Sequence, residues 1–446
     1  MNIVLLSGGS GKRLWPLSND IRSKQFIKIF KRPGELDQTG TNDGGYESMV
    51  QRVYRQIRAV DPDAVVTVAT SKTQVSSIHN QLGYDVGISV EPCRRDTFPA
   101  IALAAAYLHD VQGVGLDEAV VICPVDPYVE EDYFRAVRHL WELSESGTAN
   151  LMLLGIDPTF PSEKYGYILP ESCDEVAKVS EFKEKPDKQT AKRYIEAGGL
   201  WNGGVFAFKL RYVLTRAHEL IDFIDYTDLF DKYETLTKIS FDYAVSEHET
   251  DIAVLRFAGQ WKDLGTWNTL SEAMEEQAVG DVRFDDTCVN VHAINELSIP
   301  ILAMGLHDVV ISASPEGILV SDKERSAKMK PYVDAIKQQV MFADKSWGSF
   351  RVLDVEQNSM TIKLGIQPGK RMNYHAHEHR DEVWTVIEGT GRVIVDGMEQ
   401  PVKPGDVITM AAGCKHTVIA DTALQIIEVQ LGSEISAADK HKFELE

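Results

Sequence analysis

A glycine-rich loop and a cluster of basic side chains stand near the start of the chain and could together bind phosphate groups. The loop, LSGGSGKR at residues 6–13, follows a short apolar run. Its glycines allow the backbone to approach a ligand closely, and N–H groups exposed in such a loop attract phosphate oxygens. Residues 11–32 hold seven Lys and Arg residues and one acid, whereas the whole chain has a net charge of -21. We therefore predict a polyanion site, with the candidate residues Leu6, Ser7, Gly8, Gly9, Gly11, Lys12, Arg13 and Lys24.

Two common phosphate-binding patterns do not fit this loop. A Walker loop needs Ser or Thr after its Gly-Lys pair and an earlier glycine five positions before it. Here Arg13 follows Lys12, and Leu6 holds the earlier position. The Gly-x-Gly-x-x-Gly fingerprint of dinucleotide-binding proteins is also absent. The alternative that remains open at this point is a glycine turn beside a solvated basic helix.

The sequence around the loop carries a more specific resemblance. The run GGSGKRLWPL at residues 8–17, with KQF at 24–26, resembles the signature of the sugar-1-phosphate nucleotidyltransferases. The resemblance is closest to mannose-1-phosphate guanylyltransferases, through Ser10, Trp15 and Ser18. One departure is Ser23, which stands where that family usually has Pro. The resemblance implies that GMP passes from GTP to mannose 1-phosphate, giving GDP-mannose and pyrophosphate, with Arg13 and Lys24 stabilising the phosphates.

Such a displacement at a phosphorus needs positioning and charge neutralisation more than a protein base. A divalent cation held by carboxylate oxygens is therefore expected. Asp126 follows the apolar run 119–125 and so lies at a carboxyl edge of the expected sheet, where α/β proteins bind ligands. Asp263 lies between aromatic residues in WKDLGTW at 261–267. Either could be a plain turn cap, but both match positions at which the resembled family holds Mg²⁺.

Further motifs between residues 91 and 245 resemble the substrate-binding motifs of the same family. EPCRRDTFPA at 91–100 opens a helix, and Thr97 could cap it; Arg95 and Thr97 are candidates for nucleotide binding. YGYI, EKP, WNGGVF and SFDYAV follow in order at 165, 184, 201 and 240. Each taken singly could be an ordinary surface feature. The candidate sugar-binding residues are Tyr165, Gly166, Glu184, Lys185 and Asn202.

An independent pattern of metal ligands lies near the end of the chain. His375 and His377 would share one side of a strand, because side chains alternate along it. Glu382 and His416 can then complete a set of three histidines and a carboxylate around one transition metal, Zn²⁺ or another divalent ion. His379 has the same strand parity and competes as third histidine. A surface cluster of histidines is the alternative.

The glycine and histidine spacing of this last part resembles the cupin β-barrel of bifunctional phosphomannose isomerase–guanylyltransferases. The matching pattern is Gly-x5-His-x-His-x4-Glu-x6-Gly from residue 369, with a second hairpin ending at His416. Arg380 matches an Arg tied to isomerase activity in those enzymes. Two departures are His375, where the isomerases usually have Gln, and Ala411, which replaces a common Pro. Because a fold does not settle a function, interconversion of mannose 6-phosphate and fructose 6-phosphate is a secondary expectation.

The elements that must position these residues follow from hydrophobic periodicity. Apolar runs predict strands at 2–6, 65–70, 87–91, 119–125 and 151–156, with helices at 47–60, 100–108 and 131–144. This alternation predicts an α/β, Rossmann-like nucleotidyltransferase domain with a mostly parallel sheet. The stretch 32–45 is rich in turn-forming residues and is predicted to be a surface loop.

The rest of the chain changes character. Short β-runs at 281–330 predict a small β-roll or a few coils of a β-helix, serving as a spacer rather than an active site. A charged run at 322–330 and a helix to about residue 342 would connect it to the cupin. The expected domains are therefore a transferase at 1–280, a β-rich spacer with a connecting helix at 281–342, and a cupin at 343–446. The polar tail at 433–446 is predicted to be helical.

Composition limits the classes of function. The five cysteines are scattered without a Cys-x-x-Cys pair, which favours reduced thiols in a cytoplasmic protein. No apolar run approaches a membrane span, and no secretory signal is seen. An acidic chain argues against general nucleic-acid binding. The expected partners are GTP and mannose 1-phosphate, with no nucleic acid and no membrane, and a homo-oligomer is left open.

Two rival functions remain. One is a nucleotidyltransferase for another base or hexose 1-phosphate, since the motifs do not separate guanine from thymine. The other is a non-catalytic sugar-nucleotide-binding protein whose cupin binds a metal. Release of pyrophosphate from GTP and mannose 1-phosphate distinguishes both from the main interpretation.

Overall fold

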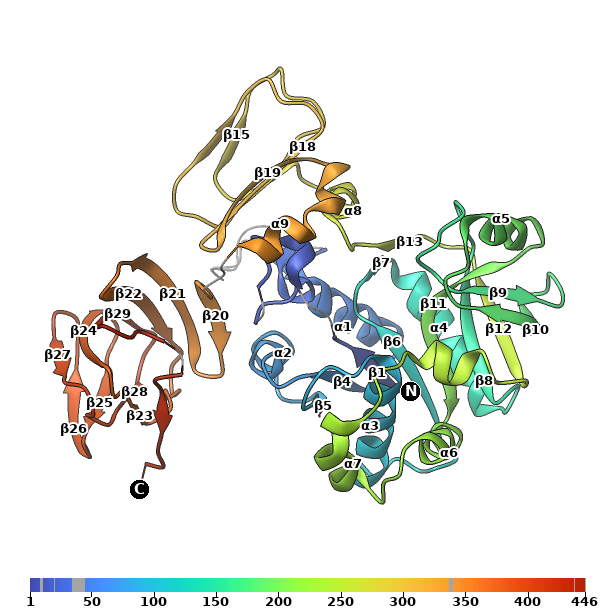
Figure 1. Ribbon diagram of the computed structural model, residues 1–446, viewed down its shortest axis with the longest axis horizontal. Helices are drawn as coiled ribbons and strands as arrows, with labels where there is room; N and C mark the ends of the chain where they lie inside the picture. The colour runs from blue at the N-terminus through green and yellow to red at the C-terminus, as the bar shows by residue number, and fades with distance from the viewer. Residues whose placement is uncertain (9–10, 20, 34–44, 337–339, 437, 446) are drawn as a thin grey trace. The chain divides into compact units, whose positions relative to one another are not determined.

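The computed structural model describes the chain apart from residues 9–10, 20, 34–44, 337–339, 437 and 446. The chain divides into two units, the first comprising residues 1–9 and 25–275 and the second residues 10–24 and 276–446. The short segment 10–24 thus belongs with the C-terminal part of the chain, although its neighbours in sequence belong to the first unit. Figure 1 labels many of the elements of each unit.

The first unit is built on a nine-stranded sheet, whose order is β5-β4-β1-β6-β11-β8-β12-β10-β9. The pairs β5–β4, β4–β1, β1–β6 and β8–β12 are parallel, and the others are antiparallel, so the sheet is mixed. The parallel pairing predicted for residues 1–160 is found among β1, β4, β5 and β6. The strands are β1 (Asn2–Leu6), β4 (Val65–Ser71), β5 (Gly87–Glu91), β6 (Ala119–Pro124), β8 (Leu151–Ile156), β9 (Tyr167–Pro170), β10 (Val176–Lys183), β11 (Leu200–Lys209) and β12 (Ile252–Phe257).

Helices cover both faces of this sheet because the strands are apolar on both sides. Val4 and Ile122 belong to a core shared with α3, whereas α4 packs on β6, β8 and β11. Helix α1 packs against α4, and α3 packs against α6 and α7. The helices are α1 (Met49–Val60), α2 (Val75–Leu82), α3 (Thr97–Asp110), α4 (Glu131–Glu145), α5 (Lys188–Glu196), α6 (Leu210–Leu220), α7 (Tyr226–Lys232) and α8 (Trp267–Ala273).

Short elements complete the first unit. Two small antiparallel pairs lie outside the main sheet, β2 (Lys28–Lys31) with β3 (Tyr46–Ser48) and β7 (Pro127–Val129) with β13 (Trp261–Asp263). Single helical turns are η3 (Tyr233–Thr235) and the π-helical turn η4 (Asp242–Ser246), and η2 (Lys24–Phe26) begins at the last residue of segment 10–24. Most of the predicted surface loop at 32–45 lies outside the described residues.

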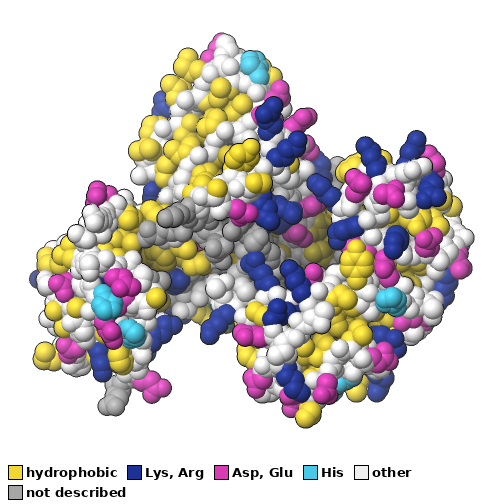
Figure 2. All heavy atoms as spheres, in the orientation of Figure 1, with side chains coloured by type: hydrophobic (Ala, Val, Ile, Leu, Met, Phe, Trp, Pro, Cys, Tyr) yellow, Lys and Arg dark blue, Asp and Glu magenta, His cyan; other side chains and the backbone are white. Residues whose placement is uncertain are grey.

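The second unit begins with coils of a parallel β-helix, at residues 278–322. Strands β14, β16 and β18 pair in parallel, as do β15 and β17, and β19 closes the larger sheet by antiparallel pairing. Hydrophobic side chains remain exposed on the β-helix (Figure 2), among them Leu302, Met304, Ile318 and Val320. The strands are β14 (Ala278–Val279), β15 (Val282–Phe284), β16 (His292–Asn295), β17 (Ile301–Ala303), β18 (Val309–Ser314) and β19 (Gly317–Asp322).

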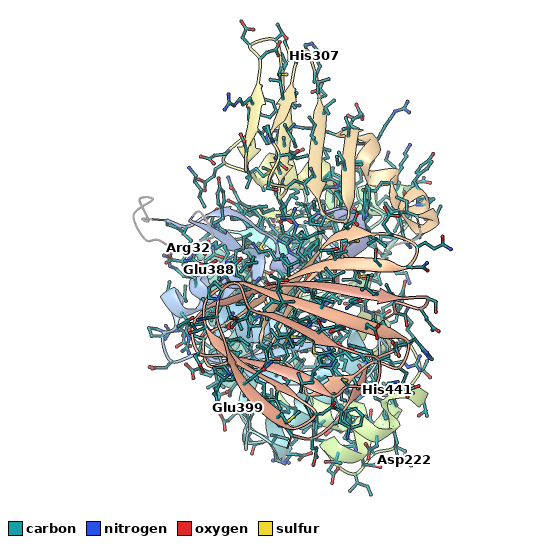
Figure 3. All side chains as sticks on the ribbon, turned by 90° about the vertical axis from the view of Figure 1, so that its left-hand side faces the viewer. Arg32, Asp222, His307, Glu388, Glu399 and His441 are labelled. Atoms are coloured by element: carbon teal, nitrogen blue, oxygen red, sulfur yellow. The ribbon has the colours of Figure 1, made fainter. Side chains whose placement is uncertain are left out.

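A cupin barrel of two facing sheets ends the second unit (Figure 3). The order of one sheet is β20-β21-β22-β29-β24-β27, and that of the other is β26-β25-β28-β23-β30. The strands are β20 (Phe342–Lys345), β21 (Gly348–Val355), β22 (Ser359–Ile366), β23 (His375–Ala376), β24 (Arg380–Glu388), β25 (Gly391–Val395), β26 (Met398–Val402), β27 (Val407–Met410), β28 (His416–Ala420), β29 (Leu424–Gly432) and β30 (His441–Lys442). Trp384, Val393 and Ile426 are fully buried between the sheets.

Two predictions about the second unit are wrong. The tail 433–446 is not helical where it is described: β30 pairs with β23 instead, because the barrel edge supplies backbone partners that an isolated tail lacks. The connecting helix is also shorter than predicted. After the turn η5 (Arg325–Lys328), α9 (Lys330–Ala335) ends before the extended Ile336, and Phe342 already begins a strand. Over the described part of the chain, no helix combines the length and apolar character that crossing a membrane requires.

Candidate functional site

Asp126 and Asp263 come together because β7 and β13, which are far apart in the chain, pair antiparallel. Asp126 follows β6 directly, and β7 begins at the next residue. In the pairing of β7 with β13, Asp263 stands opposite Pro127. Both carboxylates line one pocket of about 230 Å³, which lies at the carboxyl end of β6, as the sequence predicts for an α/β ligand site.

The same pocket collects most of the predicted sugar-binding residues. Its lining includes four of them, Tyr165, Gly166, Glu184 and Asn202. Lys185 does not line the pocket, but its ammonium pairs with Glu184. The remaining lining residues are Pro124, Pro127, Lys164, Gly203, Gly204, Asp242 and Trp261.

The Glu184 carboxylate packs closely against the backbone of Gly166. The Glu184 side chain is buried, and a Cβ at Gly166 would lie 2.6 Å from its Oε2. Only glycine therefore fits at 166 without displacing the carboxylate. Lys185 adopts a left-handed backbone conformation with φ of 44°, which is uncommon for a residue with a side chain. Such strain is concentrated at functional sites.

Asn202 and Asp242 form a hydrogen-bonded pair inside the pocket. Asn202 Nδ2 donates to Asp242 Oδ1 at 2.7 Å, and Asn202 Oδ1 accepts from the backbone N–H of Gly204 at 3.1 Å. The sheet register is interrupted between Asn202 and Phe206, an irregularity of the kind that re-aims a side chain beside an active site. The sequence motif that contains Asp242 is recognisable, but motif matching alone assigns no role to this carboxylate. The signal that the sequence offers for this residue is that Asp242 is a single acid directly after the apolar Phe241.

Burial and the neighbouring Glu184 carboxylate raise the pKa of Asp242 to about 7. Both effects penalise the charged form, because the pocket offers little water and already holds a negative charge. The hydrogen bond from Asn202 acts in the opposite direction. Asp242 therefore changes its protonation near neutral pH.

Aromatic rings form one wall of the pocket. The Tyr165 ring lies 4.9 Å from that of Trp201 and 5.4 Å from that of Trp261, measured between centroids. Burial and the charges of Asp263 and Asp126 raise the pKa of Tyr165 to about 12. Its phenol therefore stays neutral and can donate a hydrogen bond near the two carboxylates.

The glycine loop begins beside the same sheet edge. Leu6 pairs with Pro124 in the parallel pairing of β1 with β6, so Ser7 and Gly8 leave the sheet next to the segment that carries Asp126. Ser7 is fully buried, and Gln25 donates to both its Oγ and its backbone oxygen, at 3.0 and 3.1 Å. The KQF motif thus holds the first turn of the loop through its glutamine.

The described loop leaves room for a ligand. A Cβ at Gly8 would meet no described atom within 4 Å. Gly9 lies outside the described residues, and so does the side chain of Lys12; Gly11 begins the turn η1 (Gly11–Leu14). Arg13 is exposed and Lys24 is half-buried. Both belong to the second unit, whereas the pocket is built wholly from the first.

Arg95 and Thr97 contact protein rather than lining the pocket. Arg95 donates through Nη2 to the backbone oxygen of Glu234, and Thr97 Oγ1 accepts from the backbone N–H of Phe241 at 2.8 Å. The predicted cap is wrong: Asp96 is the N-cap of α3, and its carboxylate accepts from the Thr97 N–H. Thr97 is itself the first residue of α3, so the cap position falls to the residue before it.

In the cupin, His375, His377, Glu382 and His416 gather as predicted. Their potential ligand atoms all lie within 4.8 Å of one another, and each residue is 2% exposed. His377 Nε2 lies 3.0 Å from one Glu382 oxygen, and His416 Nε2 lies 3.2 Å from the other. The exposed His379 is outside this group, so the competing assignment for the third histidine is not supported.

In each of the three imidazoles the backbone engages Nδ1, so Nε2 is the nitrogen that could bind a metal. Each Nδ1 faces a backbone oxygen: that of Asn373 for His375, that of Asp439 for His377 and that of Cys414 for His416. Because Nδ1 must donate to a carbonyl, the neutral ring presents an unprotonated Nε2. Burial lowers the pKa of His375 to about 2, which keeps this ring neutral. The Nε2 lone pairs of His377 and His416 then face the Glu382 carboxylate, and a cation between them would stabilise this arrangement.

Arg380 stands beside the cluster. Its Nη2 lies 3.1 Å from His377 Nε2, its Nε donates to Glu382 at 3.4 Å, and its Nη1 donates to the Ser436 backbone oxygen at 2.8 Å. The guanidinium is therefore fixed on three sides next to the four predicted ligands. It brings a positive charge that could meet an anionic substrate.

Comparisons with known proteins agree on both parts of the chain. A nucleotidyl transferase family model matches residues 2–279, and a model of the mannose-6-phosphate isomerase C-terminal region matches residues 334–445. Similar proteins include a mannose-1-phosphate guanylyltransferase of Klebsiella pneumoniae, 28% identical over 98% of this chain and 97% of that protein. The xanthan biosynthesis protein XanB of Xanthomonas campestris is 28% identical over 99% of this chain and 97% of its own length.

Solved structures include a similar protein as well. A crystal structure described as mannose-1-phosphate geranyltransferase from Thermus thermophilus superposes with a TM-score of 0.61. It is 25% identical in sequence and covers 75% of this chain and 98% of that one.

Proposed function

Because the chain belongs to the nucleotidyl transferase family, we propose that it transfers GMP from GTP to mannose 1-phosphate, giving GDP-mannose and pyrophosphate. The observation that carries this proposal is the convergence of Asp126, Asp263, Glu184 and Asn202 on one pocket at the carboxyl end of β6. Relatives that match almost the whole chain bear the name of this activity.

The reaction is a displacement at the α-phosphorus of GTP. An oxygen of the mannose 1-phosphate group forms the new bond to that phosphorus, and the bond to the β-phosphate oxygen breaks. The sugar phosphate is already largely dianionic at neutral pH, so the protein need not remove a proton from it. What it must do is bring two polyanions together, and we assign Arg13 and Lys24 to their phosphate charges.

The sugar would lie against Glu184, Asn202 and the Tyr165 ring. Glu184 supplies an acceptor for hydroxyl groups, and the remaining N–H of Asn202 supplies a donor. Lys185 would act on the sugar through its ion pair with Glu184. We assign the nucleotide to the loop residues Leu6, Ser7, Gly8, Gly9, Gly11 and Lys12, with Arg95 and Thr97 supporting the neighbouring segment.

Asp126 and Asp263 would hold a Mg²⁺ ion. Two carboxylates side by side in one pocket are hard oxygen donors of the kind that Mg²⁺ prefers. When bound, the ion would neutralise charge that develops on the phosphate oxygens. The antiparallel pairing of β7 and β13 keeps the two carboxylates together.

The deciding experiment measures pyrophosphate release by the full-length protein with Mg²⁺, over a panel of nucleoside triphosphates and hexose 1-phosphates. The proposal expects GTP with mannose 1-phosphate to give the highest kcat/KM. A higher value with another pair would assign the protein to a different nucleotidyltransferase activity. Binding without pyrophosphate release by any pair would make it a sugar-nucleotide-binding protein.

A second function is favoured by the cupin. We propose that His375, His377, Glu382 and His416 hold Zn²⁺ or another divalent transition metal, and that the domain interconverts mannose 6-phosphate and fructose 6-phosphate. The fixed Arg380 beside the ligands is the observation that favours it. When bound, the metal would stabilise negative charge on the sugar oxygens, and Arg380 would bind the sugar or its phosphate.

Formation of fructose 6-phosphate tests this second proposal, with protein loaded separately with Zn²⁺, Co²⁺ or Mn²⁺. Turnover that is lost in Arg380→Ala is the expected result. Normal transferase activity without isomerase turnover for any metal would leave the cupin as a metal-binding module. We further propose that the chain divides functionally into a transferase at 1–280, a spacer at 281–342 and a cupin at 343–446.

A further inference from the structure

One edge of the β-helix carries a set of polar residues that the transferase proposal does not use. Strands β16 and β18 run in parallel, so the residues that follow them emerge on the same side. Glu296 follows β16, Ser314 ends β18, and Glu316 precedes β19. The Glu296 N–H donates to the Ala313 oxygen at 2.9 Å, which ties the two turns together.

Glu296 binds an arginine of the basic segment 10–24. Arg22 Nη1 and Nη2 each donate to a different oxygen of Glu296, both at 2.8 Å. The two side chains are 15% and 26% exposed. A two-point arginine–carboxylate contact fixes orientation as well as distance. Arg22 is thus committed to protein, and it is not a free charge for phosphate.

Glu316 holds the neighbouring turn. Its Oε1 accepts from Asn19 Nδ2 at 2.7 Å and from the Met341 N–H at 3.0 Å. Asn19 in turn accepts the N–H groups of Ile21 and Arg22 on its Oδ1, at 2.9 and 2.7 Å. The Asn19 amide therefore closes the turn of the basic segment on one side and anchors it to Glu316 on the other.

Phe342, the first residue of the cupin sheet, completes the anchor. Its backbone oxygen accepts from Asn19 Nδ2 at 3.2 Å, and its ring centroid lies 5.1 Å from the Arg22 guanidinium carbon. Ser314 Oγ donates to the Pro16 oxygen at 2.6 Å. A Cβ at Gly317, whose φ is 150°, would lie 2.5 Å from the Trp15 ring.

We propose that Glu296 and Glu316 are positioning residues of the transferase, which fix the basic segment so that Arg13 and Lys24 meet the triphosphate. This inference rests on the proposed function, since that function assigns those two cations to the phosphates. The spacer at 281–342 then does more than connect the transferase to the cupin, because its β-helix also positions residues of the transferase. Asn19 and Arg22 lie between Arg13 and Lys24 in the chain. Contacts that fix Asn19 and Arg22 therefore restrict the positions that Arg13 and Lys24 can take.

The test uses full-length Glu296→Gln and Glu316→Gln, with Glu324→Gln as the matched control. Glu324 is exposed near the same β-helix, and its side chain makes no cap hydrogen bond to the turn that it precedes. For each variant, KM for GTP, KM for mannose 1-phosphate and kcat are measured. Amide hydrogen exchange of residues 14–19 and 21–24 is measured on the same samples.

We expect KM for GTP to rise about tenfold in Glu296→Gln, the scale for losing a hydrogen bond to a charged group. Exchange in the basic segment should rise as well, while Glu324→Gln matches the parent in both readouts. Arg22→Gln should reproduce the effect. The double variant Arg22→Gln, Glu296→Gln should be no worse than either single one, because both remove the same contact.

Three outcomes would overturn the inference. The first is an unchanged KM for GTP in both Glu variants, whether or not exchange rises. The second is a lower kcat with both KM values unchanged, which would indicate only a smaller folded fraction. The third is a parent protein that turns over no nucleoside triphosphate, in which case the proposed function fails as well. If the parent uses a triphosphate other than GTP, the same comparison is made with that nucleotide.

Discussion

The side-chain amide of Asn202 is fixed by Asp242, which accepts its hydrogen bond at 2.7 Å across the pocket. The two residues come from different elements, β11 and the π-helical turn η4. The turn is itself anchored where Thr97 accepts the N–H of Phe241. Thr97, which was predicted to bind nucleotide, thus supports through one hydrogen bond the segment that orients the Asn202 amide, which we propose binds the sugar.

Removing the Asp242 carboxylate should weaken binding of the sugar substrate. In Asp242→Ala the Asn202 amide loses its acceptor, and we expect KM for mannose 1-phosphate to rise about tenfold, with a smaller change in KM for GTP. Asp242→Asn keeps an oxygen acceptor and should retain most of the parent's affinity. Steady-state kinetics on the three proteins check this. Equal KM values for the sugar in all three would show that Asp242 does not orient Asn202.

The raised pKa of Asp242 makes a prediction about stability. The pKa is about 7 in the folded protein against 3.8 as its ordinary value, so between these pH values the folded state holds a proton that the unfolded state has lost. Stability from this group therefore falls as pH rises from about 4 to about 7. Asp242→Asn lacks this dependence. The melting temperature of the variant minus that of the parent should therefore increase as the pH rises from about 5 to about 8. A constant difference across that range would contradict the assignment.

The two metal carboxylates should matter for turnover more than for folding. Asp126→Ala and Asp263→Ala are each expected to lower kcat by at least about 10²-fold at saturating Mg²⁺, the scale for losing one preorganised electrostatic group. Neither side chain is fully buried, so the melting temperatures should stay close to that of the parent. Near-normal turnover in both variants would remove these aspartates from the site.

Arg13 offers a test of the basic segment itself. Arg13→Lys keeps the charge but loses the planar fork that binds phosphate oxygens at two points. Because Arg13 is exposed, thermal stability without ligand should be unchanged while turnover falls. A melting temperature that drops in proportion to activity would mean that Arg13 supports the fold instead.

Metal binding by the cupin can be tested without any enzymatic readout. Adding Zn²⁺ to metal-free protein at about 100 times its dissociation constant should stabilise the cupin by about 2.7 kcal/mol, and so raise the melting temperature of that domain by several degrees. His377→Ala should abolish the shift. His379→Ala is the matched control, because His379 is exposed and outside the ligand group. A shift that survives His377→Ala but not His379→Ala would overturn the ligand assignment.

Local patterns were enough to predict much of this protein. The strands β1, β5 and β8 have the predicted bounds, because short apolar runs between turn residues suit the strands of a sheet covered on both faces. The four candidate ligands in the cupin were predicted to gather, because strand alternation and hairpin spacing indicate which side chains meet. The tail was not predictable in this way: it is polar, and only the edge of β23 makes it a strand.

The amino-acid sequence by itself determined the α/β and cupin architecture, the family resemblance and most candidate site residues, since these depend on periodicity and motif spacing. Only the tertiary structure decided which of those residues act on one another. Asp242 meets Asn202 across 40 residues, and Glu296 meets Arg22 across 274. Over such separations the path of the chain through the folded sheets, and not any local preference, sets whether two side chains touch. That is why Arg22, one of seven basic residues in a predicted polyanion site, is found bound to a carboxylate.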